Sequence, residues 1–366
     1  MRIGINALYL IPGGVGGTEI YLRSLLEALA QLDSANQYLI WTNRETAQPA
    51  LPVARNFELL PQAVSARNRP ARILWEQTML PLSAARHKLD VLFNPGFTAP
   101  VFCACPQVTV FHDLQHKRHP EYFRWFDLPF WRALLFGAAH RSKLLIAVSE
   151  ATRADLYRFY RLPQERVRVV PHGVDPAFFS LIASEAAAPF LLAVSTLHPH
   201  KNLDVLIKAF ALFAGMHPEY RLVIAGLKGF YTEPLENLRY QLGLQDRVTF
   251  TGWIPREELY RLFAQARGFV YPSRFEGFGM PILEALAAGL PTACANVEPM
   301  AGIAGGAALL FDSDDIPALA RHLETLAFDD LVRSRLHRAG PERAEQFTWA
   351  AAARATLAAL TEAAGQ

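Results

Sequence analysis

The 366-residue sequence has little of what marks a membrane-spanning, secreted or nucleic-acid-binding protein. It has no run of about eighteen apolar residues, and glycines follow its short N-terminal apolar run where a signal peptide would carry a cleavage site. A formal net charge of +2, with no long block of like charge, disfavours nucleic acid as a partner. We therefore expect a cytoplasmic protein with neither a spanning helix nor a secretory leader.

Cysteines and clustered acids are also few. Cys103, Cys105 and Cys294 cannot form a closed set of disulfides, and a lone C-x-C pair is a poor zinc site. The D-x-D sequence within FDSDD, at residues 311–315, is typical of an N-capping loop before a helix. We expect reduced thiols, no metal site and no cofactor apart from a bound substrate.

Short β-rich runs alternate with longer helical patterns along the whole chain. One series contains RIGINALYL, QYLIWTN, DVLFNP, QVTVFHD and LLIAVS, and a second contains FLLAVS, RLVIAG, VTFTG, GFVYPS, PTACAN and AALLF. This alternation predicts parallel sheets covered by helices on both faces. The predicted fold class is α/β, with two Rossmann-like, doubly wound domains.

The Ala- and Ser-rich segment SLIASEAAAP separates the two series. We place the first domain at residues 1–183 and the second at 184–345, followed by a C-terminal helix in 346–366 that packs back towards the first domain. Ligands of such sheets bind beyond the carboxyl ends of the strands. We therefore expect an interdomain cleft that holds the ligand.

The loop after the first predicted strand is IPGGVGGTE. Gly14 and Gly16 allow close backbone approach to a diphosphate or a sugar, and Thr18 can cap the next helix. A plain tight turn is an alternative. A nicotinamide fingerprint fits poorly, because Glu19 stands where its third glycine belongs and no acidic residue ends the second strand.

Two other strand ends carry candidate residues. His112 follows VTVF, where a histidine can hydrogen-bond a substrate hydroxyl or stabilise a developing charge. Lys201 lies in STLHPHKN, after the first strand of the second series, where an ammonium can reach a phosphate. Taken alone, such residues are more often a structural histidine and a solvated lysine.

The stretch PSRFEGFGMPILEALAAGLP joins a glycine-containing loop to a helix. The N–H groups of Phe278, Gly279 and Met280, at the expected helix start, are predicted to attract an anion. Glu276 and Glu284 nevertheless flank the same point. A diphosphate between two groups that carry several hydroxyls explains both carboxylates, because each can accept hydrogen bonds from a pair of hydroxyls.

The same stretch resembles the E-x(7)-E signature of the family-four retaining glycosyltransferases. VTVFHDL, AVSEATRADL, VVPHGVD, STLHPHKNLDVLIKAF, VTFTGWIPREELYRLFAQA and GGVGG resemble other blocks of that family, in the family's order and over nearly the whole chain. The resemblance implies the GT-B fold, with an acceptor-side first domain and a nucleotide-sugar-binding second domain. It also implies sugar transfer with retention at the anomeric carbon and without an essential metal.

Matched residue by residue, the resemblance assigns roles to the candidates. Lys201 corresponds to the family's phosphate-binding lysine, Glu276 to the glutamate near the transferred sugar, and Glu284 to the glutamate that holds the ribose. His112 corresponds to the histidine beside the donor sugar, and Gly14 and Gly16 correspond to the phosphate-side loop. We therefore predict His112, Glu276 and Lys201 as catalytic residues.

The sequence also departs from the family pattern. Thr196 and His200 stand where members carry an arginine, so the pyrophosphate is expected to meet one permanent cation instead of two. AGIAGGAA at residues 301–308 replaces the family's PEVAGDAA, which removes an expected glutamate.

Residues 117–143 mix Arg and Lys with Trp, Phe and Tyr, a composition suited to an anionic membrane surface. An ordinary amphipathic helix over the sheet is the alternative. Acceptor choice is expected to depend on loops at about residues 44–80 and 114–135.

Together, these features lead to one main functional hypothesis and two alternatives. The main hypothesis is a hexosyltransferase that uses a nucleotide sugar, with GDP-mannose the leading donor, and a glycan or lipid-linked acceptor in envelope polysaccharide synthesis. A nucleotide-sugar epimerase of the same fold and a non-catalytic nucleotide-sugar-binding partner of another transferase are the alternatives.

Overall fold

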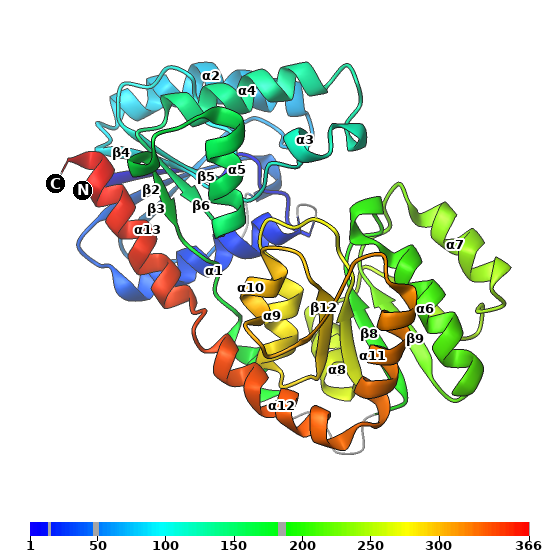
Figure 1. Cartoon of the computed structure of the whole chain (residues 1–366). Helices are drawn as coiled ribbons and strands as arrows, with labels where there is room; N and C mark the ends of the chain where they lie inside the picture. The colour runs from blue at the N-terminus through cyan, green and yellow to red at the C-terminus, as the bar shows by residue number, and fades with distance from the viewer. Residues whose placement is uncertain (14–15, 47–50, 182–187, 366) are drawn as a thin grey trace. The chain divides into compact units, whose positions relative to one another are not determined.

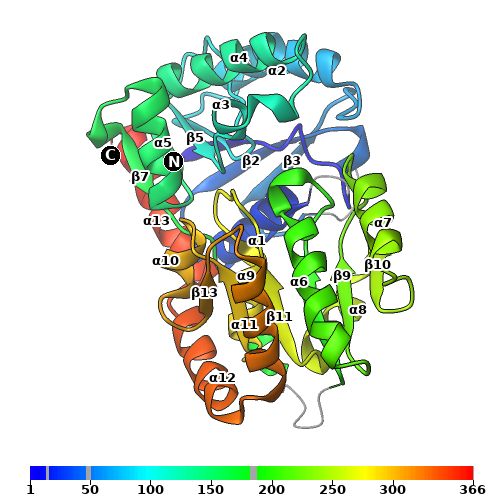
Figure 2. The ribbon, with the colours of Figure 1, turned by 45° about the vertical axis from the view of Figure 1, so that its right-hand side comes forward.

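The computed structural model describes residues 1–13, 16–46, 51–181 and 188–365 (Figures 1 and 2). The chain forms two compact units. Met1–Gly173 and Thr348–Gln366 make the N-terminal unit, and Val174–Phe347 makes the C-terminal unit.

The first unit ends at Gly173, earlier than the predicted boundary near residue 183. The short helix η4 (Pro176–Ser180) follows this point and belongs to the C-terminal unit. Its Phe178 is fully buried and packs edge-on against Tyr260 and Phe263. Burial of this ring fixes the chain to the second unit before the Ala- and Ser-rich segment begins.

The N-terminal unit is built on a sheet of seven parallel strands in the order β3-β2-β1-β4-β5-β6-β7. The strands are β1 (Arg2–Asn6), β2 (Gln37–Thr42), β3 (Phe57–Pro61), β4 (Val91–Asn94), β5 (Gln107–Phe111), β6 (Leu144–Ala147) and β7 (Val167–Val169). The inner strands are apolar because helices cover both faces of the sheet. The strand order reverses between β1 and β4, which is where α/β sheets bind ligands.

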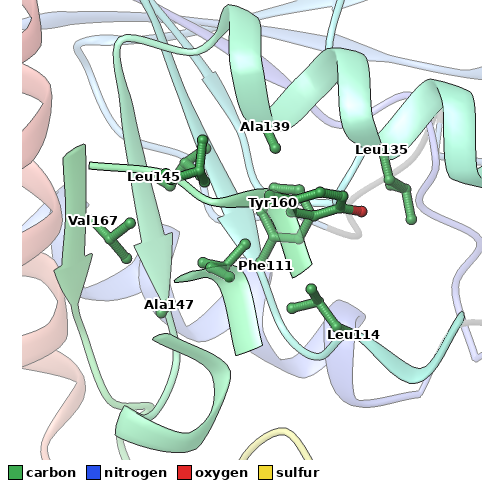
Figure 3. Packing of buried hydrophobic residues seen from close by; sticks show 10 residues of the cluster. Phe111, Leu114, Leu135, Ala139, Leu145, Ala147, Tyr160 and Val167 are labelled. Carbon is green, nitrogen blue, oxygen red and sulfur yellow. The ribbon is translucent and has the colours of Figure 1, made fainter. Parts of the chain in front are cut away.

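The helices of this unit are α1 (Gly17–Leu32), α2 (Arg69–Arg86), α3 (Gln115–Arg118), α4 (Leu128–Arg141), α5 (Glu150–Tyr160) and α13 (Trp349–Ala364), with short 3-10 turns η1 (Arg44–Thr46), η2 (Pro120–Tyr122) and η3 (Gln164–Arg166). The C-terminal helix α13 packs on α1 (Figure 1). Helix α4 also covers this sheet. Figure 3 shows its Leu135 and Ala139 packed with Phe111 of β5 and Leu145 of β6 in a buried cluster.

Two predictions about this unit are wrong. Helix α1 begins at Gly17 with Gly16 as its N-cap, so Thr18 lies within the first turn and does not cap it. Residues 44–80, predicted to be loop, contain β3 and most of α2, and residues 114–135, also predicted to be loop, contain α3, η2 and the start of α4. β3 is an edge strand with mostly exposed side chains, so it lacks the buried apolar pattern that identifies the other strands.

The C-terminal unit contains six parallel strands in the order β10-β9-β8-β11-β12-β13. The strands are β8 (Phe190–Val194), β9 (Arg221–Ala225), β10 (Val248–Gly252), β11 (Gly268–Tyr271), β12 (Thr292–Ala295) and β13 (Leu309–Phe311). The helices are α6 (Leu203–Met216), α7 (Thr232–Gln241), α8 (Arg256–Gln265), α9 (Met280–Ala287), α10 (Met300–Ala304), α11 (Ile316–Phe328) and α12 (Asp330–Ala344), with the turn η5 (Pro199–Lys201). The strand order reverses between β8 and β11.

The predicted capping loop at FDSDD is confirmed. Asp315 is the N-cap of α11, and its carboxylate accepts a hydrogen bond from the backbone N–H of Ala318 at 2.8 Å. Among the described residues, no helix combines the length and apolar character needed to cross a membrane.

Candidate functional site

Lys201 and Glu276 meet at the point where the strand order of the C-terminal sheet reverses. Lys201 follows β8, and Glu276 follows the adjacent strand β11. Lys201 Nζ donates a hydrogen bond to Glu276 Oε1 at 2.6 Å, and the two side chains are only 15% and 12% exposed. A cation and an acid therefore lie together where a sheet of this type binds its ligand.

The two loops that carry this pair are tied to each other by hydrogen bonds to backbone carbonyls. Ser273 Oγ and Arg274 N both donate to the carbonyl of His200, at 3.1 and 2.8 Å. Asn202 adopts a left-handed conformation, with φ of 55°, and its buried side-chain amide donates to the carbonyl of Pro272 at 3.1 Å. These bonds fix the two loops to each other and so keep Lys201 and Glu276 side by side.

Tyr271, the last residue of β11, is a third member of this group. Its hydroxyl donates to Glu276 Oε1 at 2.7 Å, and Lys201 Nζ lies 5.9 Å from its ring centroid. Burial would raise the pKa of Glu276, but the attraction and hydrogen bond of Lys201 hold it below its ordinary value. Burial and the Glu276 carboxylate raise the pKa of Tyr271 far above its ordinary value. Glu276 is therefore a carboxylate that accepts from two fixed donors.

The start of α9 provides the predicted N–H groups. Gly279 is the N-cap with φ of 107°, which favours glycine, and Met280 is the first helical residue. Neither Gly279 N–H nor Met280 N–H donates to a protein acceptor in the described ranges. Phe278 precedes them and is buried. Two N–H groups without a partner among the described residues thus lie at the N-terminus of a helix, where an anion is stabilised.

Glu284 lies one turn into α9 and is buried beside Arg256 of α8. The nearest guanidinium nitrogen, Nη2, is 3.9 Å from Glu284 Oε1. Asp175 accepts from Arg256 Nη2 and from the Tyr260 hydroxyl, both at 2.6 Å, so it holds the guanidinium in place. Burial raises the pKa of Glu284 to about 7, against the opposing effect of Arg256.

His112 is placed by the N-terminal unit, directly after β5. Its ring contacts those of Tyr21, Phe97 and His172. Its Nε2 lies 2.8 Å from the carbonyl of Pro95, to which it donates, so Nδ1 is the acceptor of the neutral ring. Burial lowers the pKa of His112 to about 4. The side chain therefore acts as a neutral hydrogen-bonding group at neutral pH and not as a permanent charge.

The glycine-rich loop is only partly described. Gly14 lies outside the described residues, whereas Gly16 caps α1 with φ of 59°. The buried Glu19 carboxylate accepts a hydrogen bond from Gly13 N–H at 2.7 Å and pairs with Arg23 at 2.8 Å. Glu19, which stands where a nicotinamide fingerprint would have its third glycine, thus binds the N–H group of Gly13 in the same loop.

The cysteines stay as free thiols, with Cys103 Sγ and Cys105 Sγ 3.4 Å apart and Cys294 buried. In the ranges the structure describes, no three His, Cys, Asp or Glu side chains converge as metal ligands do.

Tyr271, Arg256 and Asp175 were not predicted from the sequence. Tyr271 could have been suspected, because it is the polar last residue of an apolar strand. Arg256 and Asp175 are separated by 81 positions, and no nearby sequence pattern marks either of them as a site residue. Only the packing of η4 against α8 brings them to Glu284.

A surface of exposed apolar and basic side chains covers α2, α4 and the segment before α4. We call it the α2–α4 surface. The two helices lie side by side in both views (Figures 1 and 2), and the Arg69 guanidinium stacks 4.1 Å from the Trp131 ring centroid. Its exposed apolar side chains are Leu74, Met79, Leu82, Trp125, Phe126, Phe130 and Phe136. Residues 67–86 and 117–143 together contain ten Lys and Arg but three Asp and Glu, although the whole chain is nearly balanced at 36 and 34.

Comparison with solved structures defines the class of fold. Sucrose-phosphate synthase from Thermosynechococcus elongatus superposes with a TM-score of 0.80 at 20% identity, over 98% of each chain. At this identity the likeness concerns the fold. Two Rossmann-like units of parallel strands, with this likeness, make the chain a GT-B protein.

Comparison of sequences then identifies the family. Residues 180–343 match the family model for glycosyl transferases group 1, and residues 15–178 match that for glycosyltransferase family 4. The chain belongs to the glycosyltransferases that these two models describe.

Two curated relatives are similar over part of their length. "O-antigen chain mannosyltransferase B" of Escherichia coli is 30% identical over 253 residues, 66% of each chain. "O-antigen chain mannosyltransferase RfbU" of Salmonella typhimurium is 28% identical over 209 residues, 57% of each chain. The matched segments therefore span less than two thirds of these relatives.

Proposed function

We propose that this chain is a retaining hexosyltransferase that moves mannose from GDP-mannose to a glycan or lipid-linked acceptor in envelope polysaccharide synthesis, on the cytoplasmic side of the membrane. The observation that supports it most is the Lys201–Glu276 pair beside the N-terminus of α9. The names of the two O-antigen chain mannosyltransferases favour mannose and a polysaccharide acceptor.

The charges of the C-terminal site suit departure of a diphosphate. As the bond from the anomeric carbon to the phosphate oxygen breaks, negative charge grows on the leaving group. Lys201 and the N–H groups of Gly279 and Met280 stabilise that charge, without a metal ion. Glu276 lies next to Lys201 and favours the positive charge that develops on the sugar ring.

The remaining steps keep the anomeric configuration. The acceptor oxygen bonds to the anomeric carbon on the face that the phosphate leaves, and the leaving phosphate oxygen takes the acceptor proton. No glycosyl-enzyme intermediate forms. The Glu284 carboxylate accepts hydrogen bonds from the two ribose hydroxyls. Neutral His112 accepts a hydrogen bond from a sugar hydroxyl through Nδ1.

A thermal-shift screen with GDP-, UDP- and dTDP-sugars tests the donor, since a ligand of the folded state raises the melting temperature. NMR of the glycosidic linkage then tests retention. A β-linked product from an α-configured donor would overturn it. Donor isomerised without acceptor would indicate the epimerase, and donor affinity without any turnover would indicate the binding partner.

We also propose that the α2–α4 surface rests on anionic lipid. Exposed aromatic rings enter the headgroup region while Arg and Lys meet lipid phosphates. The excess of basic residues in this surface, and the exposure of Trp125 at 84%, support that contact. Peripheral binding would bring a lipid-linked acceptor to the N-terminal unit.

A further inference from the structure

The strand order of the N-terminal sheet reverses between β1 and β4, and a polar cluster is buried there. Glu76 of α2 accepts hydrogen bonds from Asn6 Nδ2 at 3.1 Å and Thr98 Oγ1 at 2.8 Å. Asn6 ends β1, and Thr98 follows β4. The ring of Tyr9, also after β1, lies directly on Gly96, where an added Cβ would stand 2.4 Å from it. These contacts fix α2 against both strand ends.

Arg72, one turn before Glu76 on the same helix, has no comparable partner. It is only 8% exposed, its Nε is buried without a hydrogen bond, and its guanidinium makes no ion pair or hydrogen bond with any described residue. Glu76 attracts it through space, but the hydrogen bonds of Glu76 come from neutral donors. Arg69 adds a second guanidinium nearby and repels it.

A guanidinium whose Nε is buried and unbonded is costly, because that nitrogen loses its hydration and gains no compensating bond. Burial also lowers the pKa of Arg72, which reflects that cost. A neutral sugar hydroxyl would leave the charge uncompensated. A phosphate would neutralise it, because two phosphate oxygens match the two-pronged guanidinium.

We propose that the β1–β4 switch point binds the phosphate of a phosphorylated acceptor through Arg72. The inference rests on the proposed function only in naming the ligand an acceptor. Helix α2 also carries Leu74, Met79 and Leu82 on its exposed side, so the same helix serves the buried anion site and the α2–α4 surface. This arrangement favours an acceptor whose phosphate is attached to a lipid.

Binding to the full-length Lys201→Ala protein tests the site, because that background lacks the ammonium predicted to bind donor phosphate. Isothermal titration would use farnesyl diphosphate, mannose 1-phosphate, glucuronate and neutral mannose. We expect at least one phosphorylated probe to bind and mannose not to bind. Arg72→Met should weaken the phosphate complex at least about tenfold, whereas Arg86→Met, an exposed charge on the same helix, should change it less than about twofold.

Arg72→Lys keeps the charge beside Glu76 but loses the two-pronged geometry, so it should fold normally and still bind phosphate more weakly than the parent. Binding of farnesyl diphosphate alone supports a lipid source, and binding of mannose 1-phosphate alone supports a soluble one. Equal phosphate affinity in Arg72→Met and its parent, or binding of glucuronate and neither phosphate, overturns the proposal. Since no step requires sugar transfer, failure here is distinct from failure of the transferase function.

Discussion

Lys201 Nζ lies 2.6 Å from Glu276 Oε1, although 75 positions separate the two residues in the chain. The ammonium predicted to meet the donor phosphate therefore touches the carboxylate predicted to meet the transferred sugar. In the proposed reaction, a phosphate oxygen bound to Nζ would be held next to the acid that faces the sugar ring. The bond to be broken joins those two parts of the donor, so the pair would bracket the reacting bond.

Lys201→Ala should lower kcat/KM at least about a hundredfold, or about 3 kcal/mol, because the leaving diphosphate loses its main counter-charge. Removal of the ammonium should also raise the pKa of Glu276, which remains buried. The acidic limb of the pH–rate profile should move to higher pH. Lys208→Ala, at a half-exposed lysine of α6, is the matched control. A loss below about threefold would mean that Lys201 is only a surface cation.

Substitution of Glu284 and substitution of Glu276 should change different steady-state kinetic parameters. Glu284→Gln should chiefly raise the donor KM, by about 1–2 kcal/mol, because the ribose contact is the same in ground and transition states. Glu276→Gln should chiefly lower kcat, because charge develops on the hexose only as the bond breaks. The opposite pattern would exchange the two roles. A glycosyl adduct on Glu276, seen by mass spectrometry, would replace the proposed mechanism with a double displacement.

Donor binding should weaken as pH falls through about 7. Burial raises the pKa of Glu284 to about 7, and only its ionised form accepts from both ribose hydroxyls. Arg256→Met removes the guanidinium that opposes this shift, so the midpoint of the KM profile should move to higher pH. Arg261→Met, in an exposed ion pair of the same helix, should leave the midpoint in place. A KM that does not vary with pH in the parent would contradict this assignment.

The same pKa predicts a stability effect with a defined sign. The ordinary value for Glu284 is 4.5 and its folded value is about 7, so its contribution to stability is fully present below 4.5 and is lost as pH rises through about 7. Glu284→Gln removes the buried charge. The variant should therefore gain stability over the parent at pH 8, by up to ~3 kcal/mol, and gain little at pH 5. Urea unfolding at both pH values measures the difference.

The protein should co-sediment with liposomes that contain anionic lipid, and less so at high salt. Charge reversal at Arg124 and Arg132, which are exposed in the α2–α4 surface, should reduce pelleting. Reversal at Arg335 and Arg338 of α12 changes the net charge equally and should have little effect. Equal pelleting with neutral and anionic vesicles would favour the alternative, in which residues 117–143 form an ordinary amphipathic helix over the sheet.

Activity should survive chelation by EDTA, because Lys201 and the start of α9 are expected to meet the diphosphate charge alone. Initial rates with and without EDTA, on protein purified without added metal, make the comparison. Complete loss of activity that magnesium or manganese restores would overturn the metal-independent mechanism.

Much of the fold follows from local pattern. Apolar runs of strand length alternate with helical periods, and that alternation alone predicts parallel sheets with ligand-binding residues after the strands. His112, Lys201 and Glu276 each follow a strand that could be recognised in this way. β3 and α2 were missed, because an edge strand and a helix with exposed Leu74 and Met79 do not show the usual segregation of apolar residues.

Apart from β3 and α2, the sequence by itself determined the elements discussed above, their order in the chain and the residue types at their ends, because these depend on neighbours within one turn or one strand. Only the tertiary structure decided which strand ends are adjacent. β8 beside β11 brings Lys201 to Glu276, and β1 beside β4 brings α2 over the second switch point. The tertiary structure also decided which groups are buried. Segments distant in the chain exclude water from Glu284, whose pKa is raised, and from Arg72 Nε, which has no hydrogen-bond partner. Desolvation depends on the whole packed unit, so no local pattern reports it.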